Sequence, residues 1–529
     1  MAADQGDRKL GTLDSLRAVA GQWRLLSVVL LSFSSGLPLG LVWLAIPAWM
    51  ARAGVDIKVI GLFTLAQAPW SFKLLWSPSM DRFRPPFLGR KRGWIVVAQV
   101  GLFAATLGLA GVSKHPEAVW VIASFAMAIA FASATQDIAI DAYAVEVLER
   151  REYGIASAAR TAFYRAGMLV AGGLSITLAA SLSWTVVNAL LAVLYLPLAA
   201  VAAAAPEPPG LPAPPRTLRE AVWGPFLGFL GQHRALEILA FVVLYKLSDN
   251  LTQALTRPFL VQVGFDDFDV GVATATIGQA AAILGTLVGG MLTDRIGLGR
   301  ALWIFGFLQM VSNLGYAAVA QVGPSRPLMY AAQAFELGSS GLGTGAFGVL
   351  MLRLTQKRFS ATQFALLSSL FTLPRILSGP VAGVLADAMG WRDFFVLTVV
   401  FGIPGMAMLA RFVPWGVRDV EFEVRPPARG TPVTRGGLVA RGLAGGAVAG
   451  AIGLAAVGLV GGLRGLRAHE GFAALPAIAA VLRPGGVGEW TTLAGLLVLA
   501  LLAGLATAAT VAARRGMSTA PGTPASGGE

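Results

Sequence analysis

The sequence predicts an all-α integral membrane protein with two six-helix bundles and two extra C-terminal transmembrane helices, about 14 helices in total. Of its 529 residues, 56% are hydrophobic, and the mean hydropathy is +0.69. The apolar residues form long blocks with few charges, each near the roughly 20 residues that a spanning helix needs. A membrane barrel would show strands of about ten residues with alternating polarity. The chain has no such pattern.

The first apolar block covers about residues 25–50 and contains Ser34-Ser-Gly-Leu-Pro38, which predicts a break in the helix. The block is too long for the apolar core of a cleavable signal peptide. Further helices of the N-terminal half are expected at about 57–75, 94–112, 118–144, 156–180 and 183–205.

The run Pro206–Pro215 cannot be helical, and the segment 217–237 is typical of an amphipathic stretch on the membrane surface. Six more helices are expected at about 238–261, 270–293, 301–320, 328–352, 364–386 and 394–413, and two more apolar blocks lie at 437–461 and 490–513. Small-xxx-small spacings in the first of these two blocks permit close helix packing.

The expected organisation is a cytoplasmic N-terminal segment (1–24), an N-terminal six-helix bundle (25–205), a cytoplasmic linker with the amphipathic segment (206–237), a C-terminal six-helix bundle (238–413), a cytoplasmic loop (414–435), two additional transmembrane helices (436–513) and a disordered tail (514–529).

A duplicated loop relates the two bundles. Asp81-Arg82 with Gly89-Arg90-Lys91-Arg92 follows the second predicted helix of the first bundle, and Gly290-Met-Leu-Thr-Asp294-Arg295 follows the second helix of the other. Equivalent loops at equivalent places indicate parallel repeats. Basic loops lie on the cytoplasmic side of a membrane, so both termini are expected to be cytoplasmic.

Composition excludes several classes of function. The net charge is +13, but the basic residues lie in short loops beside apolar blocks, so no nucleic-acid partner is expected. The chain has no cysteine, and its three histidines fall in predicted loops, so neither a thiol nucleophile nor a metal site is expected. No phosphate-binding loop or serine nucleophile motif occurs. We expect no enzyme activity and no cofactor.

Several longer runs carry a resemblance to a known family. They include Phe72-Lys-Leu-Leu-Trp-Ser-Pro-Ser-Met-Asp-Arg-Phe83, Gln136-Asp137-Ile-Ala-Ile-Asp141-Ala and Tyr164-Arg165-Ala-Gly-Met168. Together with the duplicated loop, they resemble the AmpG-type muropeptide permeases of the major facilitator superfamily. The resemblance implies a proton-coupled importer in the bacterial inner membrane, and we separately expect a monomer, although the sequence does not determine the oligomeric state. Its substrate would be GlcNAc-1,6-anhydroMurNAc peptides, recovered from the periplasm for peptidoglycan recycling.

Six charged residues fall within predicted helices: Asp137, Arg165, Lys246, Asp249, Glu336 and Arg375. Each would cost about 3 kcal/mol if it faced lipid, so they must face inward or pair. Three acids and three bases allow complete pairing, so a purely structural role stays open. Function is favoured because charges occur in both halves, and because the resemblance implies an anionic substrate.

Depth along the helices predicts one specific ion pair. Asp137 lies about 28 Å from the outer end of its helix, and Arg165 lies about 14 Å from the inner end of the next. The two should therefore meet, either as a gated pair or as a permanent structural one. Asp141 lies nearer the cytoplasmic mouth. The resemblance implies a latch there with Arg82 or Arg84, although direct substrate contact stays open.

The candidate residues fall into three groups. The candidates for proton coupling are Asp137, Glu336 and Asp249. Candidates for substrate binding are Gln136, Tyr164, Arg165, Lys246, Asn250, Gln333 and Arg375, with Gln279, Asn313, Trp43 and Tyr245 as further hydrogen-bonding or stacking groups that packing could equally explain. Candidates for gating are Asp81, Arg82, Asp141, Asp294 and Arg295. Of these, Asp81 and Asp294 are expected to cap neighbouring helix ends.

Two alternative functions remain open from the sequence. One is a facilitator for another organic anion, such as an acyl-coenzyme A or a peptide. The other is a membrane sensor or scaffold that transports nothing and uses its last two helices to bind a partner.

Overall fold

The computed structural model describes residues 21–55, 63–115, 118–207, 210, 212–232, 235–420, 433–467 and 471–515. The chain divides into two compact units. The first comprises residues 1–222, 237–383 and 389–421, and the second comprises residues 223–236, 384–388 and 422–529. Each unit is described by itself.

The first spanning helix is continuous from Trp23 to Arg52. It consists of α2 (Trp23–Gly40), the π-helical turn η1 (Leu41–Ala45) and α3 (Ile46–Arg52). The predicted break at Ser34–Pro38 is wrong, because Pro38 lies inside α2. Proline removes one backbone hydrogen bond, and the wider π turn directly after it accommodates the change in register.

The second predicted helix is a series of short helices in its described part. These are the 3₁₀ helix η2 (Phe63–Gln67), α5 (Ala68–Phe72), the 3₁₀ turn η3 (Lys73–Leu75) and α6 (Ser77–Arg82). Pro69 and Pro78 each stand in the first turn of a new helix. Proline is tolerated there because the first N–H groups of a helix have no intrahelical acceptor.

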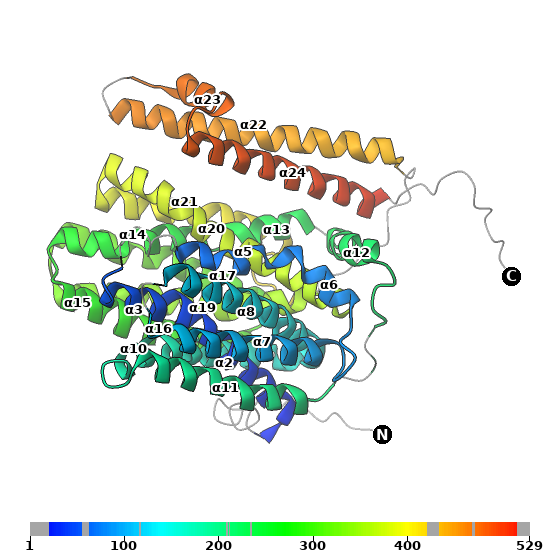
Figure 1. Cartoon of the computed structure of the whole chain (residues 1–529). Coiled ribbons are helices and arrows are strands. Elements are labelled where there is room, and N and C mark those ends of the chain that lie inside the picture. Colours follow the sequence, from blue (N-terminus) through cyan, green and yellow to red (C-terminus); the bar gives the residue numbers. More distant parts are fainter. Residues whose placement is uncertain are drawn as a thin grey trace, which may run out of the picture. The chain divides into compact units, whose positions relative to one another are not determined.

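The rest of the N-terminal half follows the predicted order. Its helices are α7 (Arg90–Val112), α8 (Val119–Val147), η4 (Arg150–Glu152), α9 (Tyr153–Leu169), the π turn η5 (Val170–Leu174), α10 (Ser175–Leu178) and α11 (Trp184–Ala204). Within this half, α9 packs along α2, and α7 packs between α8 and α11 (Figure 1).

The C-terminal half begins after α12 (Leu218–Leu230). Its elements are α13 (Ala235–Leu244), α14 (Leu247–Val263), α15 (Asp267–Gly271), η6 (Val272–Ile277), α16 (Gly278–Ile296), α17 (Leu298–Ser312), α18 (Leu314–Val322), α19 (Arg326–Leu354), η7 (Lys357–Phe359), α20 (Ser360–Met389) and α21 (Trp391–Phe412).

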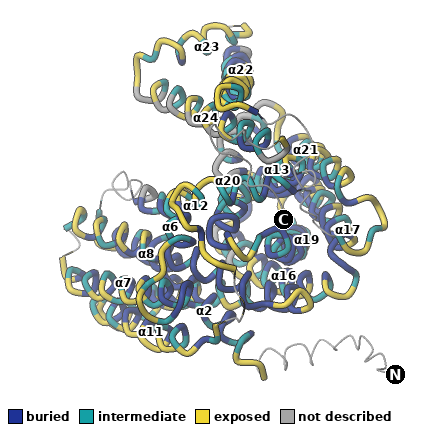
Figure 2. The backbone as a smooth tube through the Cα atoms, turned by 90° about the vertical axis from the view of Figure 1, so that its right-hand side faces the viewer, coloured by how far each residue is buried: buried dark blue, intermediate teal, exposed yellow. Residues whose placement is uncertain are grey.

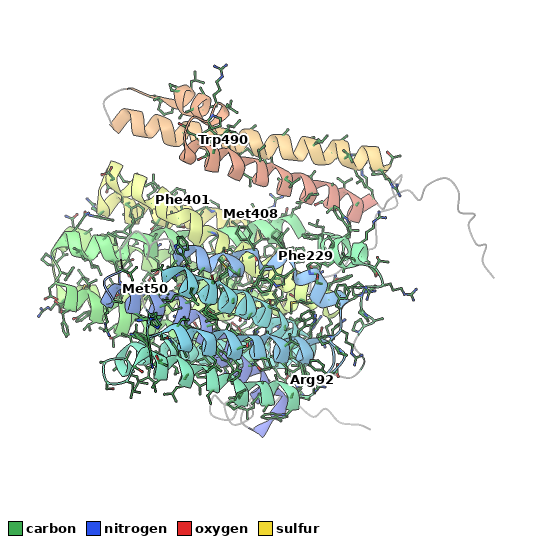
Figure 3. All side chains as sticks on the ribbon, in the orientation of Figure 1. Met50, Arg92, Phe229, Phe401, Met408 and Trp490 are labelled. Carbon is green, nitrogen blue, oxygen red and sulfur yellow. The ribbon has the colours of Figure 1, made fainter. Side chains whose placement is uncertain are left out.

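The two halves meet through α9, which packs against both α16 and α19. Figure 2 shows α2, α16 and α19 as largely buried, whereas exposed positions are frequent on the outer helices α7 and α11. Arg92 lies at the end of the bundle that holds both duplicated loops, which we call the basic end, and Met50 lies toward the other end (Figure 3).

Among the described residues, nine helices are long and apolar enough to cross a membrane. Several other predicted spans are interrupted, such as the one divided between α13 and α14, so neither part reaches spanning length alone. The fold is an all-α integral membrane fold, as predicted, and the total of fourteen helices stays a prediction.

The second unit contains α22 (Arg435–Arg467), α23 (Ala474–Leu482) and α24 (Val487–Arg515). The sequence did not predict α23. Helices α22 and α24 pack closely through glycines: a Cβ on Gly446 would lie 2.7 Å from the carbonyl oxygen of Ala500. Small residues of this kind let helix backbones approach in a membrane.

Candidate functional site

The carboxylate of Asp81, in the last turn of α6, binds the first turn of α20, which belongs to the other half of the protein. Its oxygens accept hydrogen bonds from the backbone N–H groups of Ala361 and Thr362, at 3.2 and 2.9 Å, and from the Thr362 hydroxyl at 2.8 Å. The first N–H groups of a helix lack intrahelical acceptors and favour negative charge. Asp81 therefore caps α20 and joins the two halves at the basic end.

Asp294 makes the equivalent contact in the opposite direction. It accepts hydrogen bonds from the backbone N–H groups of Gly154 and Ile155 in the first turn of α9, both at 3.1 Å. In each case the carboxylate binds the second and third residues of its helix. The duplicated loop thus caps one helix of each half from the other half.

A buried charge network surrounds Asp81. Lys91 Nζ donates to Asp81 at 2.7 Å and lies 3.9 Å from Glu146. Arg90 donates to Glu146 at 2.8 Å, and the Ser360 hydroxyl donates to the same carboxylate at 2.6 Å. Two cations and two carboxylates balance one another here, and Ser360 links the network to α20.

Glycine permits the close approach of α16 to α9. A Cβ on Gly290 would lie 2.5 Å from the carbonyl oxygen of Gly154 and 2.8 Å from the Cβ of Ala158. Neither distance is compatible with ordinary van der Waals contact. At Gly290, the backbone of α16 therefore lies directly against the backbone of α9 in the other half.

Helices α2, α7 and α8 share a buried series of side-chain hydrogen bonds. Gln99 Nε2 donates to Ser34 Oγ, which donates to Gln136 Oε1, both at 3.1 Å. The buried Oδ1 of Asp137 has no hydrogen-bond partner within the described residues. Ser34 therefore ties α2 to both α7 and α8, whereas Asp137 keeps an unused acceptor.

Asp141 has different cationic partners from those expected. Arg160 donates to Asp141 Oδ1, and Lys73 Nζ lies 3.9 Å from Oδ2. Arg82 instead lies over a neighbouring aromatic ring, at 5.6 Å from its centroid. The expected latch with Arg82 or Arg84 is not present in this structure, because cations of α9 and η3 reach Asp141 from within the same half.

Arg165 faces the C-terminal half, and its expected pairing with Asp137 is not present. Its Nη1 donates to Gln279 Oε1 of α16 at 2.6 Å. Arg160, which binds Asp141, lies five residues earlier and therefore about 140° away around the helix axis. Since one arginine already points toward α8, the other points away from it.

Two arginines and two tryptophans gather where the halves face each other. The Arg375 guanidinium carbon lies 5.6 Å from the ring centroid of Trp43, and the Trp43 and Trp70 rings meet edge to face at 6.0 Å. Arg165 is near enough to Arg375 for the two charges to repel, and Tyr164 lies close to both. Neither arginine has a carboxylate partner among the described residues, so this region carries two uncompensated positive charges.

Lys246 is the centre of a buried cluster in the C-terminal half. Its Nζ donates to Asp249 at 2.9 Å, to Gln309, and to the carbonyl and hydroxyl oxygens of Ser340 at 2.8 and 3.0 Å. The residue stands between α13 and α14, where the helix is interrupted. Four acceptors share three N–H donors, so Lys246 holds α14, α17 and α19 together and has no donor left for a substrate in this structure.

Glu336 belongs to the same cluster. Its Oε1 accepts a hydrogen bond from Gln253 at 3.0 Å, and its buried Oε2 has no partner within the described residues. Lys246 and Asp249 are its charged neighbours. One cation faces two carboxylates, so the cluster carries one net negative charge unless a carboxylate is protonated.

Three other candidate residues make local contacts. Asn250 Nδ2 donates to the Lys246 carbonyl of its own helix at 2.8 Å, and Gln333 accepts from a buried tyrosine hydroxyl at 2.6 Å. The backbone carbonyl of Arg295 accepts a hydrogen bond from Arg418 at 3.3 Å.

Sequence reasoning missed Lys73, Lys91, Trp70 and Gln253. Lys73 had a signal, because it stands inside an apolar run, Phe72-Lys-Leu-Leu75. Lys91 had none, since the sequence predicted it in a loop with other basic residues, where an exposed side chain is expected. In the part of the chain that the structure describes, no three His, Cys, Asp or Glu side chains gather in a way that would hold a metal ion.

Two halves built from a parallel repeat, joined by reciprocal caps and enclosing charged clusters, define a membrane transporter. The comparisons agree: the family model described as Major Facilitator Superfamily matches residues 28–361. The chain belongs to the Major Facilitator Superfamily.

Relatives confirm the resemblance to AmpG-type permeases. The anhydromuropeptide permease of Escherichia coli strain K12 is 43% identical over 384 residues, which cover 72% of this chain and 78% of that protein. A Haemophilus influenzae protein is 33% identical over 399 residues, covering 72% of this chain and 92% of the relative. The chain is a multi-pass membrane transporter and not an enzyme, as predicted.

A solved structure shows the same fold. The proton:xylose symporter XylE, bound to 6-bromo-6-deoxy-D-glucose, superposes with a TM-score of 0.57 at 11% identity, covering 74% of this chain and 96% of that one. At this identity the likeness concerns the fold alone.

Proposed function

We propose that this protein imports anhydromuropeptides, GlcNAc-1,6-anhydroMurNAc with or without a peptide, across the bacterial inner membrane together with protons. The observation that supports this choice of substrate is the 43% identity to the E. coli anhydromuropeptide permease. The basic end faces the cytoplasm, as the positive-inside rule expects, and both termini lie on that side. The direction of transport is from the periplasm to the cytoplasm, for peptidoglycan recycling.

The pair Arg165 and Arg375 supports an anionic substrate. Muropeptides carry carboxylates on the peptide, and guanidinium groups bind carboxylates through paired, charge-assisted hydrogen bonds. The two arginines lack carboxylate partners among the described residues, and they come from α9 and α20, one in each half. A bound carboxylate would remove their mutual repulsion and connect the halves.

Charge counts favour Glu336 as the proton carrier. Around Asp137, the acids Asp137 and Asp141 are balanced by Lys73 and Arg160. Around Glu336 there is one carboxylate more than there are cations, and a buried unpaired charge is costly in a membrane. Binding one proton neutralises that cluster. Asp249 accepts a hydrogen bond from Lys246 at 2.9 Å, and Asp137 acts as a secondary proton site.

The caps at the basic end support a gating role for Asp81 and Asp294. In the described structure the halves are joined at that end, which corresponds to a transporter closed toward the cytoplasm. Opening toward the cytoplasm requires both carboxylates to leave the first turns of α9 and α20. The salt bridge between Asp141 and Arg160 lies within one half, so Asp141 would act by orienting α8 against α9.

Uptake into proteoliposomes tests the proposal. The purified protein is supplied with radiolabelled GlcNAc-anhydroMurNAc-tripeptide, with and without an imposed proton gradient. We expect accumulation only with the gradient. Glu336→Gln should retain substrate binding and exchange but lose gradient-driven accumulation. The control Asp393→Asn, at an exposed position in the first turn of α21, should behave as the wild type.

The alternatives give different results in the same assay. Uptake that is unchanged after the gradient collapses would refute proton coupling. Uptake of other organic anions in preference to the muropeptide would favour a different facilitator. Binding without any uptake would favour a sensor.

A further inference from the structure

Two buried indole N–H groups lie side by side in the N-terminal half without acceptors. Trp43 Nε1 and Trp70 Nε1 are both inaccessible and have no hydrogen-bond partner within the described residues. Their rings meet edge to face, at an interplanar angle of 87°. Buried tryptophan N–H groups usually find an acceptor, so two adjacent unpaired donors call for an explanation.

The backbone places Trp43 at an unusual point of the first helix. It lies in the π turn η1, and π turns inside α-helices occur frequently at functional sites. Measured from the basic end of each helix, Trp43 lies at about 30 Å, Arg375 at about 22 Å and Arg165 at about 18 Å. A molecule entering from the other end would meet the tryptophans first and the arginines next.

Arg375 covers one face of the Trp43 ring from the opposite half. Its side chain is exposed, and its guanidinium is repelled by Arg165. The contact is a cation–π interaction, which is weak at exposed sites. A carboxylate ligand binds a guanidinium more strongly than this, so an anionic ligand can draw Arg375 away from the indole.

We propose that Trp43 and Trp70 form a subsite for an N-acetylated pyranose, and that Arg375 covers Trp43 until a substrate carboxylate displaces it. The sugar ring stacks on the uncovered indole face, and the two N–H groups donate to acetamido or hydroxyl oxygens. The carboxylates of the same substrate bind Arg375 and Arg165, one to two turns deeper. This subsite rests on the proposed function, because the muropeptide joins N-acetyl sugars to an anionic peptide.

Binding measurements on the full-length protein in nanodiscs test the subsite. The probes are GlcNAc-anhydroMurNAc-tripeptide, and neutral N,N′-diacetylchitobiose as its competitor. Trp43→Phe and Trp70→Phe keep an aromatic ring but lose the N–H donor, and each should weaken muropeptide binding about tenfold. The control is Trp49→Phe, in the same helix, where the indole packs on Trp184 with ring centroids 5.7 Å apart. It should bind within twofold of the wild type.

The variant Arg375→Gln tests whether a substrate carboxylate displaces Arg375 from Trp43, or whether Arg375 only packs against the indole. It should weaken binding of the anionic muropeptide about tenfold or more, yet bind the neutral disaccharide as well as the wild type or better, because the indole face is uncovered. If Arg375→Gln weakens binding of both probes equally, the proposal that a substrate carboxylate displaces Arg375 is wrong.

The outcomes also separate this inference from the proposed function. If the wild type binds muropeptide and both Trp→Phe variants bind it equally well, the subsite is refuted alone. If the wild type does not bind muropeptide, the proposed function fails and the subsite with it.

Discussion

Replacing Asp81 by asparagine should open the basic end of the transporter. The carboxylate makes three hydrogen bonds to α20 across the halves and one to Lys91 at 2.7 Å. Asparagine keeps one acceptor oxygen but removes the charge, so Lys91 is left with Glu146 at 3.9 Å as its nearest carboxylate. This cost applies only while the halves are closed, because Lys91 is hydrated when they separate.

The size of the effect follows from these contacts. Hydrogen bonds to charged groups contribute about 1.5–3 kcal/mol each, and leaving a buried ion without its partner costs about 3–5 kcal/mol. Because asparagine retains some of the bonds, we expect the closed state to lose about 3 kcal/mol relative to the open one. That corresponds to a roughly 150-fold change in the ratio of the two populations.

Cysteine labelling measures this ratio directly, because the chain contains no native cysteine. Ser157 is buried where α9 meets α19, so a Ser157→Cys background reports separation of the halves. In inside-out vesicles, Asp81→Asn should raise the rate of maleimide labelling by about two orders of magnitude. Asp294→Asn, which loses only two backbone hydrogen bonds, should raise it about tenfold. The reasoning is wrong if Asp294→Asn has the larger effect, or if Asp81→Asn folds normally and labels like the parent.

Two further predictions follow from the packing and the buried charges. Gly290→Ala places a methyl group against the backbone of α9, so transport in the uptake assay should fall about tenfold. The control is Gly338→Ala, whose added carbon would have its nearest neighbours at 3.9 Å. It should transport within twofold of the wild type in the same assay. Lys246→Met leaves Asp249 buried without its cation, so thermal denaturation should show a free energy of unfolding lower by about 3–5 kcal/mol. The double variant Lys246→Met with Asp249→Leu should recover most of that loss. Equal destabilisation by the single and double variants would show that the pair is not the source of the effect.

Hydropathy and the duplicated loop predicted most of the fold, because helix length and loop charge are set locally along the chain. Three kinds of detail depended on tertiary context. Proline at 69 and 78 divided one predicted helix into short pieces, whereas Pro38 did not break its helix. The interruption at Lys246 is stabilised by acceptors from α14, α17 and α19, which no local pattern encodes.

The depth of a candidate residue is easier to predict from the sequence than its partner, because rise per residue gives depth along a helix. Five of the six charged residues stand within helices, whereas Lys246 stands at the interruption between α13 and α14. Rise does not give the direction of a side chain around the helix axis. Arg165 therefore faces Gln279 and not Asp137, and Arg160 pairs with Asp141. π turns such as η1 and η5 change the direction of the residues that follow them. The roles proposed for these residues stay predictions.

The reciprocal caps have the geometry of an interface between two identical subunits. Asp81 of one half binds the second and third residues of α20, and Asp294 of the other binds the second and third residues of α9. An isologous contact of this kind is what a two-fold homodimer forms, with each subunit giving what it receives. Joining the halves in one chain frees the two contacts to diverge in strength. On the Asp81 side, ion pairs with Lys91, Arg90 and Glu146 surround the cap. One substitution would therefore weaken a single contact and leave the other in place, so that the proposed gate would shift by degrees.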